Sequence, residues 1–296
     1  MTLLDASETQ DVPKAFLRKL GELHAQFDER TQDSGNVSYG IQVDGLRYFV
    51  KTAGAPTSPA FLGHEQRVSW LRNAIRVSEA VKDPSVPHLR NVIESPHGPL
   101  LVYDWVPGEL VGVPRERRSD PRSAFQRFKS LPLSELAEAL TSVFRVHAAL
   151  AARGWIASDF YDGAMMYEFG TRRLSLVDLD MYRSAPFTND VGRMFGSTRF
   201  MAPEEFDRGA TIDDRTTVFT MGRCIQVFLD REPPERDSRA HRSFLSIAES
   251  ACRTKPSDRW SSTEEFYAAW LQAKVHLDPA GGPTPRCTSR GKKAST

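Results

Sequence analysis

The sequence predicts an α+β fold of two lobes, in which a small antiparallel sheet precedes a mainly helical region. Alternating apolar residues between 39 and 51 indicate strands, and the apolar spacing from about residue 132 onward is typical of helices. Pro107-Gly108 ends the last predicted strand of the first region and marks the connection to the second. We therefore expect a sheet lobe over residues 31–104 and a helical lobe over residues 105–275.

The elements of the first lobe follow from local patterns. Apolar residues between 12 and 27 recur at helical spacing, which predicts a helix within an N-terminal extension of residues 1–30. Residues 39–43 and 46–51 alternate on either side of Asp44-Gly45, a pair that suits a type I′ turn and so predicts a hairpin. Residues 61–80 have a helical pattern, and residues 100–103 form a short apolar run typical of a buried strand.

The second lobe is predicted to be helical from about residue 132, with a strand pair at about 164–180. Three further helical patterns cover residues 214–229, 240–253 and 262–274. The last residues, 276–296, are basic and rich in Pro, Gly and Ser, which predicts a disordered tail.

Composition narrows the class of protein. The chain has 296 residues, 26% of them charged and 40% hydrophobic, which is ordinary for a protein with a sizeable core. A net charge of +1 gives no reason to expect a nucleic-acid or membrane partner. The three cysteines are widely spaced, and the chain starts without a signal-peptide pattern or a bilayer-spanning run. We expect a cytoplasmic protein.

The most informative segment is residues 196–206, which read Gly-Ser-Thr-Arg-Phe-Met-Ala-Pro-Glu-Glu-Phe. A buried Glu204 needs a cationic partner, and Arg259 offers one downstream. The same letters could also simply begin a helix, with Pro203 in its first turn. With Arg259, however, the segment resembles the end of the activation segment of the protein-kinase superfamily. The resemblance covers about residues 31–275 and implies a two-lobed kinase-like fold.

The resemblance implies ATP and Mg²⁺ as cofactors and assigns roles to scattered residues. Phosphoryl transfer needs a cation on the phosphates, carboxylates for the metal, and a carboxylate that receives the acceptor proton. Lys51 resembles the phosphate-binding lysine, and Glu65 the helix glutamate that holds it. Asp159 takes the position of the proton acceptor, and Asp178 that of the magnesium ligand.

The expected nucleotide pocket departs from the family pattern. Its loop, residues 33–40, keeps Gly35 and Gly40 but lacks the middle glycine, and its polar Asn36 and Ser38 are similar to aminoglycoside-type kinase loops. The resemblance also implies that the backbones of two residues between the lobes meet the base, with Tyr103 behind them: Asp104 and Val106. Phe49 stands where kinases place a small residue against adenine.

The expected metal site and its supports also differ from the family. Ala164 replaces the metal-binding asparagine, and Asp180 replaces a glycine, so we expect Asp178, Asp180 and Asp162 to hold magnesium together. Ala157 and Ser158 replace the usual His-Arg pair, which argues against control by a phosphorylated activation loop. Thr217 replaces the aspartate that braces the catalytic loop.

Three functions stay open at this point. Ser197 stands where serine/threonine-specific kinases keep a hydroxyl, which favours transfer of the γ-phosphate to a protein Ser/Thr hydroxyl. The polar loop favours a small-molecule kinase with a small hydroxyl acceptor. Phe49, Ala164 and Thr217 favour a catalytically silent nucleotide-binding protein.

Overall fold

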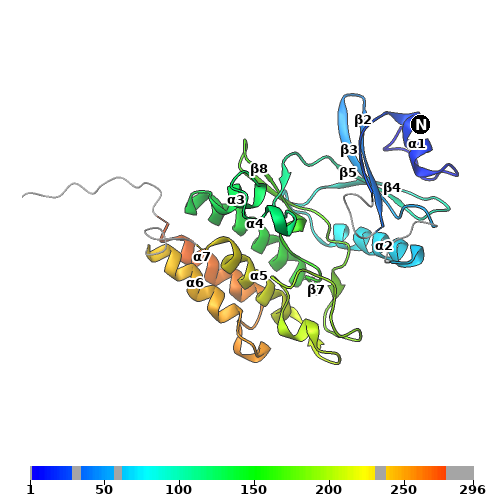
Figure 1. The fold of residues 1–296 in the computed structure, drawn as a ribbon. Coiled ribbons are helices and arrows are strands. Elements are labelled where there is room, and N and C mark those ends of the chain that lie inside the picture. Colours follow the sequence, from blue (N-terminus) through cyan, green and yellow to red (C-terminus); the bar gives the residue numbers. More distant parts are fainter. Residues whose placement is uncertain (1, 29–34, 57–61, 231–237, 278–296) are drawn as a thin grey trace, which may run out of the picture.

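A five-stranded antiparallel sheet opens the fold, and a mostly helical region with small sheets follows it (Figure 1). The computed structural model describes residues 2–28, 35–56, 62–230 and 238–277. The large sheet has the order β1-β2-β3-β5-β4, with β1 Glu22–Phe27, β2 Val37–Val43, β3 Leu46–Thr52, β4 Leu89–Ile93 and β5 Leu100–Asp104. This arrangement confirms the predicted α+β class and the order of sheet and helices.

The hairpin of β2 and β3 is confirmed, together with its turn. Asp44 and Gly45 have φ angles of 50° and 79°, the left-handed values that both central residues of a type I′ turn require. Strand β5, which pairs with β3, also lies where the sequence predicts it.

The helix predicted over residues 12–27 is wrong in its second half. Helix α1 spans only Pro13–Leu20, and β1 then pairs with β2. A Cβ at Gly21 would come within 2.3 Å of the Gln42 carbonyl oxygen, so only glycine fits where the chain turns from helix into sheet. Half-buried residues alternate with exposed ones along β1, which fits the two-residue period of a strand as well as the helical spacing that we inferred.

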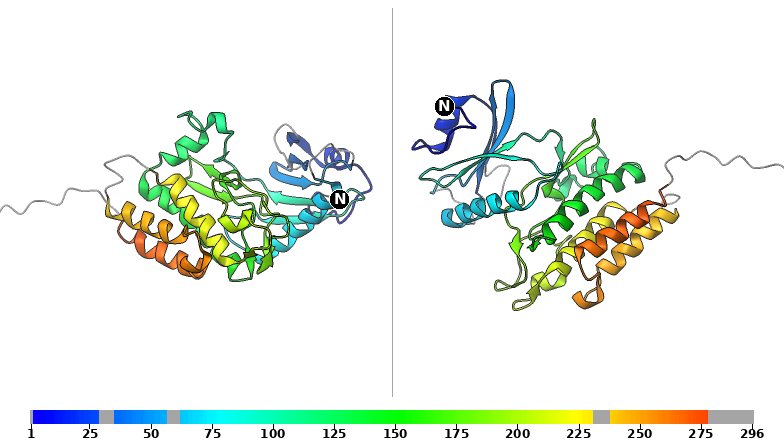
Figure 2. Two further views of the ribbon diagram at one scale, coloured as in Figure 1. Left: turned by 60° about the horizontal axis from the view of Figure 1, so that its bottom comes forward. Right: turned by 180° about the vertical axis from the view of Figure 1, so that it is seen from behind.

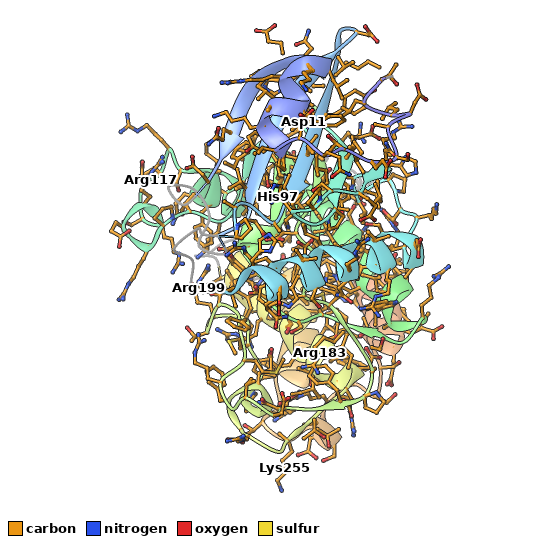
Figure 3. The ribbon with its side chains drawn as sticks, turned by 90° about the vertical axis from the view of Figure 1, so that its right-hand side faces the viewer. Asp11, His97, Arg117, Arg183, Arg199 and Lys255 are labelled. Carbon is orange, nitrogen blue, oxygen red and sulfur yellow. The ribbon has the colours of Figure 1, made fainter. Side chains whose placement is uncertain are left out.

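The two faces of the large sheet are covered differently. Leu3, Phe16 and Leu17 from the N-terminal segment and α1 pack on one face. Helix α2, His64–Ala80, contributes Leu71 and Ala74 to an apolar cluster on the other face. The ribbon of this helix runs across the strands of the sheet at their lower ends in Figure 3. Leu101, which belongs to that second cluster, lies directly opposite Lys51 in the register of β3 and β5. Lys51 therefore points to the α2 side of the sheet.

The helical region is built around α4, Leu133–Ala151, one of its longest helices (Figure 2). Its other helices are α3 Ala124–Lys129, α5 Asp214–Phe228, α6 Arg239–Ala251 and α7 Thr263–Lys274. Trp270 of α7 stacks on Phe244 of α6 with ring centroids 4.2 Å apart, and it also meets Phe144 of α4. These contacts close a continuous apolar core, in which the three predicted C-terminal helices are confirmed.

Short strands complete the helical region. The predicted strand pair at 164–180 is confirmed as β8 and β9, which join β6 in a three-stranded sheet. Two further pairs are β7 with β10 and β11 with β12. The bounds of these strands are β6 Glu109–Leu110, β7 Trp155–Ile156, β8 Met165–Glu168, β9 Arg173–Leu176, β10 Arg183–Ser184, β11 Phe187–Thr188 and β12 Thr211–Ile212.

None of the helices in the described ranges has the length and apolar character needed to cross a bilayer. The predicted disordered tail lies outside the described residues from residue 278 onward, as do residues 33 and 34 of the predicted nucleotide loop.

Candidate functional site

Lys51 and two aspartates form the centre of the candidate site. The Nζ atom of Lys51 lies 2.6 Å from Oδ1 of Asp178 and 2.5 Å from Oδ2 of Asp180, just beyond the end of β9. Burial alone would lower the pKa of Lys51, but the two carboxylates outweigh it and raise that pKa. Lys51 is therefore a permanently charged group held between the sheet and the helical region.

The predicted pair between Lys51 and Glu65 is wrong. Glu65 is exposed in the first turn of α2, whereas the buried face of that helix carries Arg67, Leu71, Ala74 and Val77. The helical period places residue 65 outside that face. Arg67 is itself buried and donates hydrogen bonds to the backbone carbonyls of Ala53, Ala55 and Leu62.

Asp159 lies in the same electrostatic environment as Lys51 and Asp178. Burial, and then the nearby charge of Asp178, raise the pKa of Asp159 to about 7, although Arg193 and Lys51 act in the opposite direction. Asp159 and Asp178 have φ angles of 60° and 62°, in the left-handed region that most residues avoid. Strained backbone of this kind gathers at functional sites, so these two positions stand out independently of their charge.

The predicted metal ligand Asp162 does not join the other two aspartates. Its carboxylate is almost fully buried and pairs with Nη2 of Arg199 at 2.5 Å. Among the described residues, no group of three or more acidic, cysteine or histidine side chains is arranged to hold a metal ion. The predicted three-aspartate magnesium shell is therefore wrong, because Arg199 from the 196–206 segment neutralises Asp162.

Thr217 braces the loop that carries Asp159. Its Oγ1 accepts a hydrogen bond from the backbone N–H of Ala157 at 3.1 Å, and both groups are buried. A buried N–H must find an acceptor, and a threonine hydroxyl serves as one. A threonine hydroxyl thus supplies this support where the sequence lacks the aspartate.

The predicted ion pair between Glu204 and Arg259 is present. The guanidinium donates two hydrogen bonds to the Glu204 carboxylate, at 2.7 and 2.8 Å, and both side chains are buried. Thr216 donates a third hydrogen bond to Glu204 from α5. The pair ties the 196–206 segment to the last part of the helical region.

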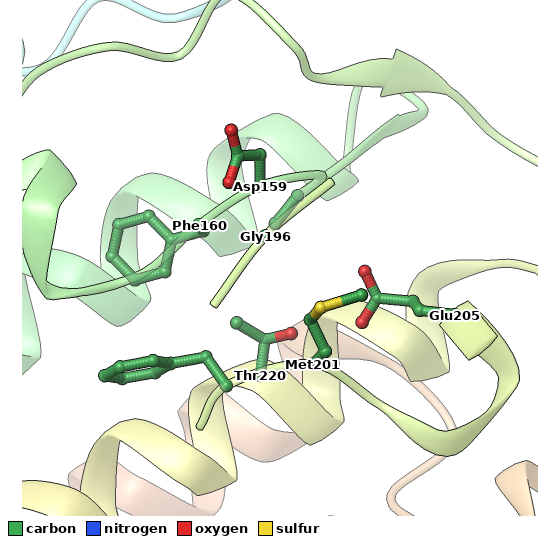
Figure 4. Close-up of a pocket in the computed structure, with 8 residues that line it drawn as sticks. Asp159, Phe160, Gly196, Met201, Glu205 and Thr220 are labelled. Atoms are coloured by element: carbon green, nitrogen blue, oxygen red, sulfur yellow. The ribbon is translucent and has the colours of Figure 1, made fainter. Parts of the chain in front are cut away.

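A narrow recess that has no room for a water molecule lies beside Asp159 (Figure 4). Asp159, Gly196, Met201 and Glu205 line it together with Ala157, Phe160, Phe200 and Thr220. A Cβ at Gly196 would lie 3.7 Å from Oδ1 of Asp159, so Ser197 follows directly after a residue that approaches this carboxylate. Burial raises the pKa of Glu205 to about 8, even though its carboxylate accepts the Ala202 N–H. The sequence carried no signal that Glu205 would line the same recess as Asp159.

Aromatic residues occupy the sheet face next to Lys51. Phe49 packs against Phe27 with ring centroids 5.8 Å apart. Gly40, directly opposite Phe49, is approached by Trp105, whose ring would come within 2.8 Å of a Cβ at that position. The missing side chain of Gly40 thus makes room for the indole.

The other predicted nucleotide-site residues surround this face. Ser38 lies directly opposite Lys51 in the hairpin. Gly35, with a φ of 78°, and the buried Asn36 precede β2. Asp104 ends β5, where its carboxylate pairs with Arg90 and its N–H donates to the His88 carbonyl, and Val106 follows two residues later. Contacts of these residues with a base stay a prediction.

Two residues that the sequence did not reveal hold the aspartate segment in place. Nδ2 of Asn73 in α2 donates to the carbonyls of Asp180 and Tyr182, each at 2.7 Å. The Tyr182 hydroxyl also lies 2.6 Å from Nε2 of the buried His147 in α4. An asparagine on a helix has no pattern that predicts such bonds, because its partners are backbone atoms more than a hundred residues away.

The side chains that converge here suit a phosphate group and a divalent cation. The Lys51 ammonium is a cation of the kind that binds phosphate, and the carboxylates of Asp178 and Asp180 offer the hard oxygen ligands that magnesium prefers. No protein-family model matches this chain, and a search of curated proteins finds none that is similar to it.

Proposed function

We propose that this chain is an ATP-dependent phosphotransferase resembling a serine/threonine protein kinase, with a two-lobed kinase-like fold. The observation that carries the proposal is the meeting of Lys51 and Asp178, which lie 127 residues apart in sequence but 2.6 Å apart in space. The charges of both groups act on the pKa of Asp159, which Asp178 raises and Lys51 lowers. A cation, a metal-ligand candidate and a carboxylate with a raised pKa are the side chains that phosphoryl transfer needs.

Two interactions that hold the segments around the candidate site in place also favour a phosphotransferase. The Glu204–Arg259 pair anchors the segment whose sequence resembles a kinase activation segment. The Thr217 hydrogen bond holds the loop that carries Asp159. A phosphotransferase depends on such positioning, because the reaction leaves little covalent chemistry to the protein.

Each residue would have a defined task. ATP bound with Mg²⁺ would supply the phosphoryl group and a metal to neutralise its charge. Lys51 would hold the phosphates, and Asp178 would hold the metal. Asp159 would accept the proton of an acceptor hydroxyl, which requires its ionised form and therefore a pH near or above about 7. The resemblance at Ser197 favours a protein Ser/Thr hydroxyl as acceptor, and we expect the protein to act in the cytoplasm.

A catalytically silent nucleotide-binding protein is the second candidate. Lys51 fills the space between the two carboxylates that would bind metal, and Arg199 holds Asp162. Phe49 and Trp105 cover part of the sheet face where the resemblance would place a base. In that case the chain would bind nucleotide without transferring phosphate.

Incubation with labelled ATP and Mg²⁺, with and without a generic protein substrate, separates these candidates. Asp159→Asn should lower turnover by roughly 10²-fold or more, whereas Asp190→Asn, at an exposed carboxylate, should not. Label on protein supports the proposed function, and ATP turnover without protein label favours a small hydroxyl acceptor. Nucleotide binding without any turnover would favour the silent protein. Equal turnover in Asp159→Asn and the wild type would refute the role of Asp159.

A further inference from the structure

The two carboxylates beside Lys51 are not equivalent. The side chain of Asp178 is 64% exposed, whereas that of Asp180 is only 8% exposed, like that of Lys51 itself. Water screens an interaction with an exposed carboxylate but hardly reaches a buried pair. The ion pair with Asp180 is therefore the less screened of the two, although the ammonium also donates a hydrogen bond to the exposed Asp178.

Helix α2 offers no carboxylate that could do this instead. Its two acidic residues, Glu65 and Glu79, are both exposed. The buried face carries an arginine and apolar side chains. A buried ammonium needs a counter-charge close by, and within the described residues both ion pairs of Lys51 are with the segment after β9.

Helix α2 nevertheless contacts that segment. The Asn73 amide nitrogen donates hydrogen bonds to the carbonyls of Asp180 and Tyr182. The amide oxygen accepts a hydrogen bond from Arg76. An amide whose donors and acceptor are all satisfied is held in one orientation. The position of Asp180 is thus tied to the position of α2.

We propose that Asp180 is the residue that positions the Lys51 ammonium, and that α2 acts on Lys51 through Asn73 and Asp180 rather than through a glutamate of its own. The proposal rests on the proposed function for its catalytic consequence. It replaces the expected metal role of Asp180 with a positioning role and leaves Asp178 as the metal-ligand candidate. A shift of α2 would then change the site by moving residues 180–182.

Steady-state kinetics test the catalytic consequence. Asp180→Asn and Asn73→Ala should each lower kcat at least about tenfold and change KM for ATP little, because Lys51 remains present but is no longer aligned. Glu65→Gln tests the competing arrangement and Glu79→Gln serves as the matched control, and both should retain wild-type kcat. Recovery of Asp180→Asn by excess Mg²⁺ would show a metal ligand and overturn the proposal. A loss in Glu65→Gln equal to that in Asp180→Asn would also overturn it.

Melting temperatures test the pairing without any nucleotide. Lys51→Met leaves Asp180 buried without a cation, so the double variant Lys51→Met/Asp180→Leu should melt above Lys51→Met alone. The matched cycle with Asp178→Leu should show a clearly smaller recovery, because Asp178 is exposed. Equal recoveries in the two cycles would refute the preference for Asp180. A wild type without turnover would refute the proposed function, whereas these melting temperatures would still decide the pairing.

Discussion

Replacing Arg259 by alanine removes the partner of a buried carboxylate. The guanidinium makes two hydrogen bonds to Glu204 and three more to the backbone carbonyls of Arg215, Arg253 and Thr254. Without the guanidinium, the hydroxyl of Thr216 is the one side chain among the described residues that still donates a hydrogen bond to Glu204. An uncompensated buried charge costs about 3–5 kcal/mol, and we expect the free energy of unfolding to fall by that amount.

Thermal unfolding measures this loss directly. For a chain of this size about 1 kcal/mol shifts the melting temperature by roughly 2–4 °C, so Arg259→Ala should melt about 6–20 °C below the wild type. Arg253→Ala is the matched control, because it removes an exposed arginine side chain six residues away in sequence. Arg259→Lys keeps the charge but loses the bidentate hydrogen bonding, so its melting temperature should lie between those of Arg259→Ala and Arg253→Ala. If Arg259→Ala and Arg253→Ala melt at the same temperature, the pair contributes no stability and the reasoning is wrong.

Three further predictions concern the site and its supports. The pKa of Asp159 lies at about 7 in the folded chain, against an ordinary value of 3.8. Between these two pH values the folded chain therefore binds more protons than the unfolded chain does. The free energy of unfolding should therefore fall as pH rises from about 4 to about 7, by at most about 4 kcal/mol, and urea titrations of Asp159→Asn should show a flatter profile. Thr217→Val strands the N–H of Ala157 and should cost about 1–3 kcal/mol in urea unfolding, whereas a Thr217→Ser variant that retains wild-type stability would be consistent with this reading. Arg199→Ala leaves Asp162 buried without its cation and should cost about 3 kcal/mol by the same measurement, and an unchanged midpoint would contradict the pairing.

The sequence was sufficient to predict those residues of the candidate site that stand in a recognisable order of motifs along the chain. The resemblance to kinase motifs singled out Lys51, Asp159 and Asp178. It also indicated Arg259 as the cationic partner that a buried Glu204 requires. The partners of Lys51 and Asp162 were predicted wrongly. Several carboxylates stand at suitable distances along the chain, and sequence spacing alone cannot show which of them faces a given cation.

Local pattern was sufficient for the hairpin at Asp44-Gly45 and for the three C-terminal helices, because turn geometry and apolar periodicity act within a few residues. It was not sufficient for residues 22–27, whose spacing suits a helix and a strand alike until pairing with β2 selects the strand. The same holds at the site. Residue type decides which groups can be charged, but only the packing of α2, β3 and the segment after β9 decides that Asp180 is buried against Lys51 while Glu65 faces solvent. Electrostatic partnership depends on burial and distance, and both arise only when the chain has folded.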